Sequence, residues 1–427
     1  MRKSPKHLRA KHLFYAPLQV VKNIKIGVFI SLVNILIQGV SVLVQNIIAN
    51  NLGIVNFGYF GILQSDYTIF CALADFGMAT LILAYFGKRA TKGRLFTNVL
   101  QLRLAMTGVA AFAMVSFAVF VRPDHPAFWG EVILAFGLLF QHAFFDWYFI
   151  CGNFWKKLLI SKVLHTIAYT SIMGIALCIF HIESIGGVAF AMVLAALPAF
   201  GFGVRQAFTP KVFDIGPHTR RFFSLMFKSA LPYALASLAS FAYLPAGLYT
   251  VSHVAPPEFL GAYNFSHKLI ILASGLMVHF ISSSLITLHQ TDSHTLHIRD
   301  QLVFTLFIIV VSSPFWLFPD QTLQVIFFAA PWTSDVLNQS ALCLRLLSLS
   351  LVLQALRMAM VSTMLKEKRT MLYGTMITAG GFVNVAICSL GANHVMPEAI
   401  PMLTLSGDVF LTIVLAFYFT KNDRIRW

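Results

Sequence analysis

Residues 50–88, NNLGIVNFGYFGILQSDYTIFCALADFGMATLILAYFGK, decide the fold of this chain. A short uncharged turn leads into about thirty mostly apolar residues, which make a helix of about 45 Å, long enough to cross a bilayer with both interfaces. Two aspartates, Asp66 and Asp75, lie inside it. A charge at mid-membrane is unfavourable by about 2.5–3.5 kcal/mol on insertion scales, so each carboxylate needs a partner, water or a function. Because nine residues turn the helix through about 900°, the two aspartates point to opposite faces and cannot share one site.

The composition of the whole chain is that of a membrane protein. Of the 427 residues, 58% are hydrophobic and 11% are charged, and the mean hydropathy is +0.77. Soluble domains carry about 25% charged residues, so we expect an all-α polytopic membrane protein.

The net charge of +15 is distributed in a way that argues against nucleic acid as a partner. Nearly all Lys and Arg residues are assigned to alternate loops and to the termini, which is the pattern of cytoplasmic loops. The exceptions are Arg122, in an opposite loop, and Lys268, Arg345 and Arg357, inside apolar spans. We therefore expect both termini in the cytoplasm, facing the anionic lipids of that leaflet.

Motifs of an enzyme or a metalloprotein are absent from the sequence. It has no GxxxxGK[ST] phosphate loop, no HExxH and no Cys/His cluster. The five cysteines lie in apolar runs without metal-ligand spacing, which favours a packing role. We predict no catalytic residue, no metal and no cofactor. The first apolar run lacks a small-x-small cleavage site, so we expect a retained span rather than a signal peptide.

Hydropathy divides the chain into twelve predicted spans. They lie near residues 26–48, 57–86, 99–121, 131–151, 158–180, 185–204, 229–251, 259–288, 301–318, 339–364, 371–391 and 397–419. The longest basic connection marks the boundary between two halves. The predicted organisation is a basic N-terminus at 1–25, an N-lobe at 26–204, a cytoplasmic linker at 205–228, a C-lobe at 229–420 and a tail at 421–427.

Short motifs in both halves carry a family resemblance. LG at 52–53, FGY at 57–59 and ADFG at 74–77 resemble the second-helix signature of Wzx-type polysaccharide and O-antigen flippases, a branch of the MOP exporter superfamily. PEFLGAY at 257–263 echoes it in the second half, and CLRLLSL at 343–349 is similar to a third family segment. Each FGY-like motif opens the second helix of a six-span half, which predicts parallel repeats about an axis along the membrane normal.

The resemblance implies a fold, a function and a location. The fold is two six-helix bundles, MATE-like or MOP-like, around a hydrated cavity. The function is to flip a polyprenyl-(pyro)phosphate-linked oligosaccharide from the cytoplasmic to the outer leaflet of a bacterial inner membrane by alternating access. The expected partners are that lipid-linked sugar, membrane lipids, a proton or sodium ion, and the polysaccharide polymerase machinery.

Cations inside the spans are the candidate ligands for a lipid phosphate. An anion in a low-dielectric cavity needs Lys or Arg, so Lys268, Arg357 and Arg345 are predicted to attract the headgroup. Each has a structural alternative: Lys268 reaches the interface by snorkelling, Arg345 anchors there, and Arg357 pairs with an aspartate.

Polar side chains in two spans are the candidate ligands for sugar hydroxyls. In the first span, Asn34, Gln38 and Gln45 fall on one stripe about 60° wide, which also suits plain helix–helix contact. Asn264 shares a helix face with Lys268 and His279 in the eighth span, where His279 is expected to be a satisfied buried group.

Intramembrane acids are the candidates for ion coupling. Asp75 lies in the family motif, and Asp66 is the second acid of that span. His142 and Asp146 lie one turn apart and could carry protons, because a carboxylate stabilises the charged form of a histidine. A structural role is the alternative for each of these four residues.

Two other functions remain open at this point. A multidrug or metabolite antiporter of the same superfamily would be favoured if the basic groups were buried against aspartates and left an acidic lumen. A non-transporting membrane scaffold of polysaccharide assembly would be favoured by a cavity without polar lining.

Overall fold

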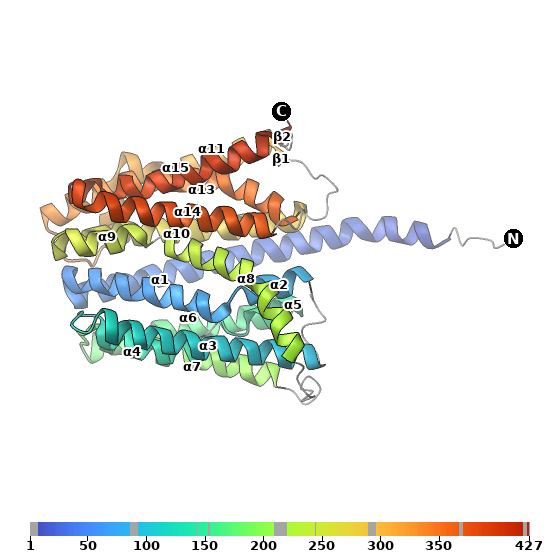
Figure 1. Cartoon of the computed structure of the whole chain (residues 1–427), viewed down its shortest axis with the longest axis horizontal. Helices are drawn as coiled ribbons and strands as arrows, with labels where there is room; N and C mark the ends of the chain where they lie inside the picture. Colours follow the sequence, from blue (N-terminus) through green and yellow to red (C-terminus); the bar gives the residue numbers. More distant parts are fainter. Residues whose placement is uncertain are drawn as a thin grey trace.

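The computed structural model describes residues 7–85, 93–141, 143–152, 154–208, 220–243, 245–288, 296–366, 370–421 and 425–426. Helices dominate this part of the chain and run along one axis, so the predicted all-α fold is confirmed (Figure 1). Among the described residues, seven helices are long and apolar enough to cross a membrane. A further pair, Thr305–Leu317 with Pro319–Ile326, is bent by 93°.

The first half of the chain forms seven helices within the described residues. They are α1 (His7–Asp75), α2 (Met78–Tyr85), α3 (Gly93–Val121), α4 (Phe128–Gly137), α5 (Asp146–Cys151), α6 (Trp155–Gly174) and α7 (Ile185–Ala207), with a 3-10 turn η2 (Leu138–Phe140) after α4 and a π-helical turn η3 (Ile175–Ile179) after α6.

The second half continues the pattern. Its described elements are α8 (Arg220–Tyr243), α9 (Ala246–Val254), α10 (Pro257–Leu288), β1 (Leu296–His297), α11 (Ile298–Leu317), α12 (Pro319–Ile326), α13 (Ser334–Lys366), α14 (Thr370–Gly391), η4 (Ala392–His394), η5 (Pro397–Ala399), α15 (Ile400–Lys421) and β2 (Ile425–Arg426). The two-residue strands β1 and β2 pair in parallel. Each predicted span coincides with helical residues in the described ranges.

The chain reverses inside α1 at a single residue. Gly53 has φ 70° and ψ 171°, and helical residues lie on both sides of it. A Cβ at Gly53 would meet nothing within 4 Å, so glycine is needed here for its backbone freedom rather than for space. The connection predicted at 49–56, between the first two spans, is therefore too long, because the single left-handed residue Gly53 makes the turn.

Three of the predicted spans are interrupted in the structure. The second span bends at Phe76 and Gly77, with φ of 47° and 66°. The fourth is interrupted between η2 and α5, where Phe144 and Phe145 pack around Phe200 instead of extending a helix. The seventh is divided between α8 and α9, with Pro245 as the residue that caps α9.

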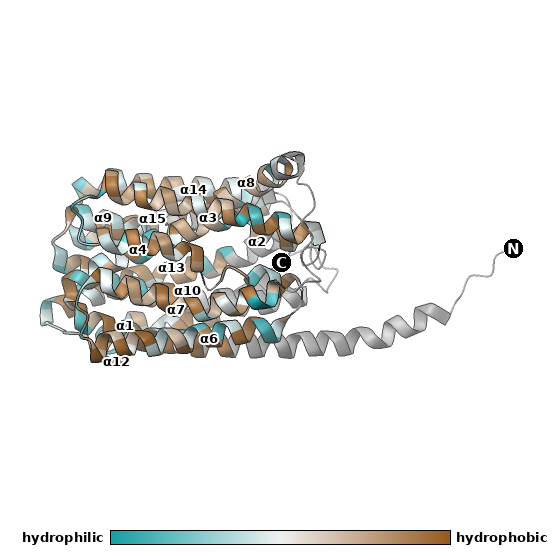
Figure 2. Cartoon of the chain, turned by 90° about the horizontal axis from the view of Figure 1, so that it is seen from below, coloured by the Kyte–Doolittle hydropathy of each residue, from teal (hydrophilic) through white to brown (hydrophobic). Residues whose placement is uncertain are grey.

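The bundle has two ends that differ in content. The far end carries the Gly53 turn, the segment 122–127, the end of α9 and α12, whereas α1 begins and α15 ends at the opposite, termini end (Figure 1). Between them the helices contain many hydrophobic residues (Figure 2). Phe112 and Phe120, for example, are 76% and 83% exposed. Such an exterior is expected to lie in lipid.

Contacts between the two halves run along α1, and this contact is called the lobe seam below. α1 packs against α10 and also against α8. The largest buried apolar cluster includes residues of both halves. A second cluster, at the termini end, joins α2, α3 and α5 to Met226, Ala230 and Tyr233 of α8. The first part of α8 thus packs on the N-lobe, although the predicted lobe boundary lies at 229.

Candidate functional site

Three predicted site residues meet in the N-lobe near the termini end. Asp75 at the end of α1 pairs with Arg103 of α3 at 2.9 Å, and the Arg103 side chain is 5% exposed. Asp146 lies where the positive charges of Arg103 and Lys162 act on it. Lys162 of α6 donates to Asn34 Oδ1 at 3.2 Å. Two carboxylates therefore balance two cations, which is the arrangement that buried charges require.

Asp66 lies in a separate cluster at the far end, as its opposite helix face predicted. Its Oδ2 atom is 2.8 Å from Arg122 Nη1 at the end of α3. Its Oδ1 atom accepts a hydrogen bond of 2.6 Å from the hydroxyl of Tyr249 on α9. Glu131 of α4 lies 3.5 Å from the same Arg122 nitrogen. This cluster joins the two halves of the chain through Tyr249.

The deep arginine of the second half is paired. Arg357 of α13 contacts the carboxylate of Asp408 on α15, and its guanidinium lies 5.7 Å from the ring centroid of Tyr243. Both side chains are nearly inaccessible to solvent. These contacts fit the alternative in which Arg357 pairs with an aspartate for structural reasons. A role for Arg357 in substrate binding stays a prediction.

Lys268 has different surroundings from the other intramembrane cations. It lies on α10 at the lobe seam, and its ammonium group donates to the side-chain oxygen of Gln64 on α1. Within the described part of the chain it forms no ion pair with a carboxylate. In this position no carboxylate among the described residues offsets a positive charge on the Lys268 side chain.

Arg345 lies at about the same depth as Lys268. Ser266 donates to the Ser340 carbonyl at 2.5 Å and Ser274 to Gln354 Oε1 at 2.7 Å, so α10 and α13 run side by side in one direction. Arg345 is exposed and, among the described residues, makes no ion pair.

The polar stripe of the first span reaches the seam at one position. Gln38 faces α10 at Gly275, where an added Cβ would lie 2.5 Å from its Nε2 atom. The side-chain oxygens of Gln38 and Gln45 are buried and receive no hydrogen bond within the described structure. A sugar hydroxyl is a donor that could satisfy such an oxygen.

Asn264 is fully buried between the halves. Its Nδ2 atom donates to the Phe57 carbonyl at 2.7 Å, and its side chain lies where a Cβ on Gly61 would be. This position holds α1 and α10 together, and a role in substrate binding stays a prediction. His142 and the side chain of His279 lie outside the described residues.

Sequence reasoning missed several residues of these clusters. Arg103 and Lys162 each lie about a turn inside a predicted span, and they were assigned to the basic ends of neighbouring loops. Glu131 and Tyr249 lie just inside the far ends of their spans and were not considered. A search for every ionisable side chain within the span limits would have found Arg103, Lys162 and Glu131.

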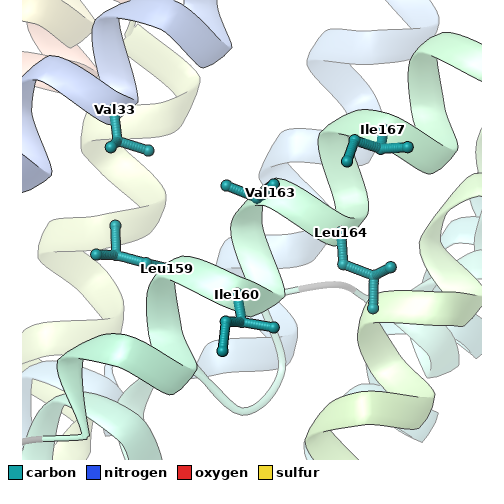
Figure 3. A pocket seen from close by; sticks show the side chains of 6 residues that line it. All are labelled: Val33, Leu159, Ile160, Val163, Leu164 and Ile167. Carbon is teal, nitrogen blue, oxygen red and sulfur yellow. The ribbon is translucent and has the colours of Figure 1, made fainter.

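An apolar pocket opens between α1 and α6 (Figure 3). Its volume is about 350 Å³ and it is lined by Val33, Leu159, Ile160, Val163, Leu164 and Ile167. Such a wall suits a hydrocarbon chain and offers nothing to a sugar or a phosphate. Among the described residues no group of three or more His, Cys, Asp or Glu side chains is placed to hold a metal ion.

Comparison with known proteins supplies a family and a fold. The family model described as polysaccharide biosynthesis protein matches residues 23–286. No curated protein sequence matches the chain. Among solved structures, the lipid II flippase MurJ in an inward closed conformation superposes with a TM-score of 0.74 at 12% identity, over 93% of this chain and 88% of that one.

Two transporters of the MOP superfamily are similar as well. An inward-facing multidrug resistance MATE transporter gives a TM-score of 0.66 at 12% identity, covering 90% of this chain and 94% of the other. A Pyrococcus furiosus transporter whose binding pocket has reversed polarity gives 0.57 at 13%, covering 94% and 96%. The likeness confirms the MOP-type fold, and the family match confirms the resemblance on which the sequence prediction rested.

Proposed function

The chain belongs to the polysaccharide biosynthesis protein family, and from that premise we propose that it is a flippase for a polyprenyl-(pyro)phosphate-linked oligosaccharide. It would move this lipid from the cytoplasmic to the outer leaflet of a bacterial inner membrane. Its termini end would face the cytoplasm, where exposed Lys156, Arg205 and Lys421 match the positive-inside rule. Its action would be conformational, without catalysis or a cofactor.

The charge of Lys268 is the observation that carries the proposal. Asp408 offsets Arg357, and Asp75 with Asp146 offsets Arg103 with Lys162. At the seam, the amide of Gln64 is the partner of Lys268 among the described residues. A lone ammonium in a low-dielectric seam favours an anionic ligand, and the (pyro)phosphate of a lipid-linked sugar is such a ligand.

Neighbouring features supply contacts for the rest of the substrate. Gln64, Gln38 and Gln45 offer amide groups to sugar hydroxyls along α1. The pocket between α1 and α6 offers an apolar path on which the prenyl chain could stay in contact with lipid. Rocking of the two halves about the α1–α10 contact would expose Lys268 first to one side of the membrane and then to the other.

The same charge distribution argues against export of cationic drugs. In the described part of the chain, the aspartates at 66, 75 and 408 each contact an arginine, so a cation offsets each of these three carboxylates. Coupling of transport to a proton or sodium ion through Asp75, Asp66, Asp146 or His142 remains a prediction. So does the association with polysaccharide polymerase machinery.

Substitution of Lys268 tests the proposal directly. Lys268→Gln should reduce surface glycan export at least tenfold, with lipid-linked intermediates accumulating on the cytoplasmic side, and Lys268→Arg should restore most of it. Lys156→Gln is the control: it removes one positive charge from an exposed position outside the predicted site. Protein level in the membrane is measured for each variant.

Two outcomes would overturn the headgroup role. One is normal export by Lys268→Gln at normal protein level. The other is equal loss in Lys268→Gln and Lys268→Arg, which would point to the hydrogen bond with Gln64 rather than to charge.

A further inference from the structure

The far-end cluster holds one more carboxylate than cation. Asp66 of α1 and Glu131 of α4 both contact Arg122, at 2.8 and 3.5 Å from its Nη1 atom. Glu131 has no exposed surface, and neither of its oxygens accepts a hydrogen bond from a donor group. With both carboxylates ionised the three side chains carry a net charge of −1, which is costly to bury.

One proton would resolve both the charge and the unmet hydrogen bonds. The carboxyl groups of Asp66 and Glu131 both approach the same Arg122 nitrogen, which places two carboxyl groups beside one cation. An ionised carboxylate can only accept, so two carboxyl groups share a hydrogen bond only when one is protonated. The same proton makes the cluster neutral, and it belongs to the pair rather than to either residue.

The cluster is also a point of contact between the two halves. Tyr249, on α9 of the second half, donates to Asp66 at 2.6 Å, and Arg122 lies 5.4 Å from the centroid of the Tyr249 ring. Asp66 accepts hydrogen bonds from both Arg122 and Tyr249. The hydrogen bond between the two halves therefore depends on the carboxylate of Asp66 as its acceptor.

One histidine lies in the segment beside the cluster, close to Arg122 in the chain. His125, between α3 and α4, packs edge-on against Tyr59 at 5.2 Å. Burial, together with the positive charges of Arg122 and His253, lowers the pKa of His125 to about 4. His125 is therefore neutral above that pH and leaves the charge of the cluster to Asp66, Glu131 and Arg122.

We propose that Asp66 and Glu131 bind a single proton that controls closure of the far end. With the proton bound, the cluster is neutral and Tyr249 stays on Asp66. When the proton leaves to water on the far side, the uncompensated charge favours hydration of the cluster and separation of α9 from α1. The direction of this motion rests on the proposed alternating access, whereas the proton site rests on the cluster alone.

Distance measurement across the far end tests the control of closure. Spin labels are placed at Glu183→Cys and Glu258→Cys, two exposed positions in different halves, in a background where Cys71 and Cys178 are serine. In purified wild type, raising the pH should shift the label distances toward longer values. Glu131→Gln, neutral at every pH, should keep the short distance throughout. Tyr249→Phe should give longer distances even at low pH.

A vibrational measurement tests the proton itself. Infrared difference spectra between low and high pH should contain the band of a protonated, buried carboxyl group, and Glu131→Gln should lack it. Lys268→Gln is the control, because it should leave both the band and the pH-dependent distance unchanged even if export is lost.

Several results would overturn the proposal. They are a label distance in wild type that does not change with pH, a Glu131→Gln variant that titrates like wild type, or a carboxyl band that survives in Glu131→Gln. All are read without the lipid substrate, so a failure here is separate from a failure of the flippase proposal.

Discussion

The two ends of the lobe seam close with different chemistry. At the far end the halves meet through hydrogen bonds and close backbone approach: Tyr249 to Asp66, Asn264 to the Phe57 carbonyl, and Gly58 against Gly261. At the termini end they meet through apolar groups, with Phe76 and Phe227 stacked at 4.6 Å. Directional, titratable contacts respond to a proton or a polar ligand, whereas apolar contacts respond mainly to packing.

Removal of Asp75 should produce the largest change at the termini end. Asp75→Ala leaves Arg103 buried without its partner, and breaking a buried ion pair costs about 3–5 kcal/mol. We expect a marked fall in the thermal unfolding temperature, measured in detergent. The double variant Asp75→Ala with Arg103→Met should recover much of it. If Asp75→Ala instead unfolds at the wild-type temperature but loses ion dependence of transport, ion coupling is its main role.

Gly261→Ala should disturb the far end next most strongly. An added Cβ would lie 2.3 Å from the backbone oxygen of Ile54, and overpacking of this kind costs about 1–3 kcal/mol. Opening of the far end relieves the clash, so we expect long label distances at every pH and loss of most transport. Gly39→Ala, where the added Cβ meets nothing within 4 Å, is the control. Wild-type distances in Gly261→Ala would show that the seam repacks there.

Phe227→Leu should have a smaller effect, confined to the termini end. Aromatic pairs contribute about 0.5–1.5 kcal/mol beyond the area they bury, and Leu keeps most of the apolar contact with Phe76. Labels at the termini end should report a modest opening, while the far-end distance and its pH dependence stay as in wild type. A change at the far end of similar size would mean that the two closures are not independent.

His125 should affect stability only in acid. Its pKa in the folded protein is lowered to about 4, below the usual value near 6.5, so the unfolded chain binds the proton more readily. Stability is therefore complete above about pH 6.5 and decreases as the pH falls toward 4. In His125→Asn, thermal unfolding measured between those values should depend less on pH. An unchanged pH profile would assign the acid sensitivity to other groups.

Much of the fold could be predicted from the sequence, because lipid imposes a simple rule. A span must be long, apolar and helical, so the positions of the helices follow from hydropathy. The breaks could not be placed as well. Gly53 and Gly77 carry a visible signal, since glycine permits the positive φ that each turn requires, but the interruption after η2 depends on how Phe144 and Phe145 pack around Phe200.

The candidate site was predictable in its members but not in its pairings. Intramembrane charges were easy to identify, and the opposite faces of Asp66 and Asp75 followed from helix geometry. Which cation meets which acid depends on the packing of helices that are distant in sequence. From the sequence, Arg357 and Lys268 are equivalent candidates for an unpaired cation. The structure distinguishes them, because Asp408 lies beside Arg357.

One helix contributes to both bodies of the protein. The first part of α8 contacts the N-lobe cluster through Met226 and Tyr233, and its later part packs on α14, where Gly381 lies against Ala239. Because α8 packs on both halves of the protein, it cannot move as a rigid unit with either half. Any swing of the lobes must be absorbed as flexure within α8, and Pro232, which lacks a backbone donor, lies where the rod is softest. The bending stiffness of α8 would then determine how far the two halves move in each transport cycle.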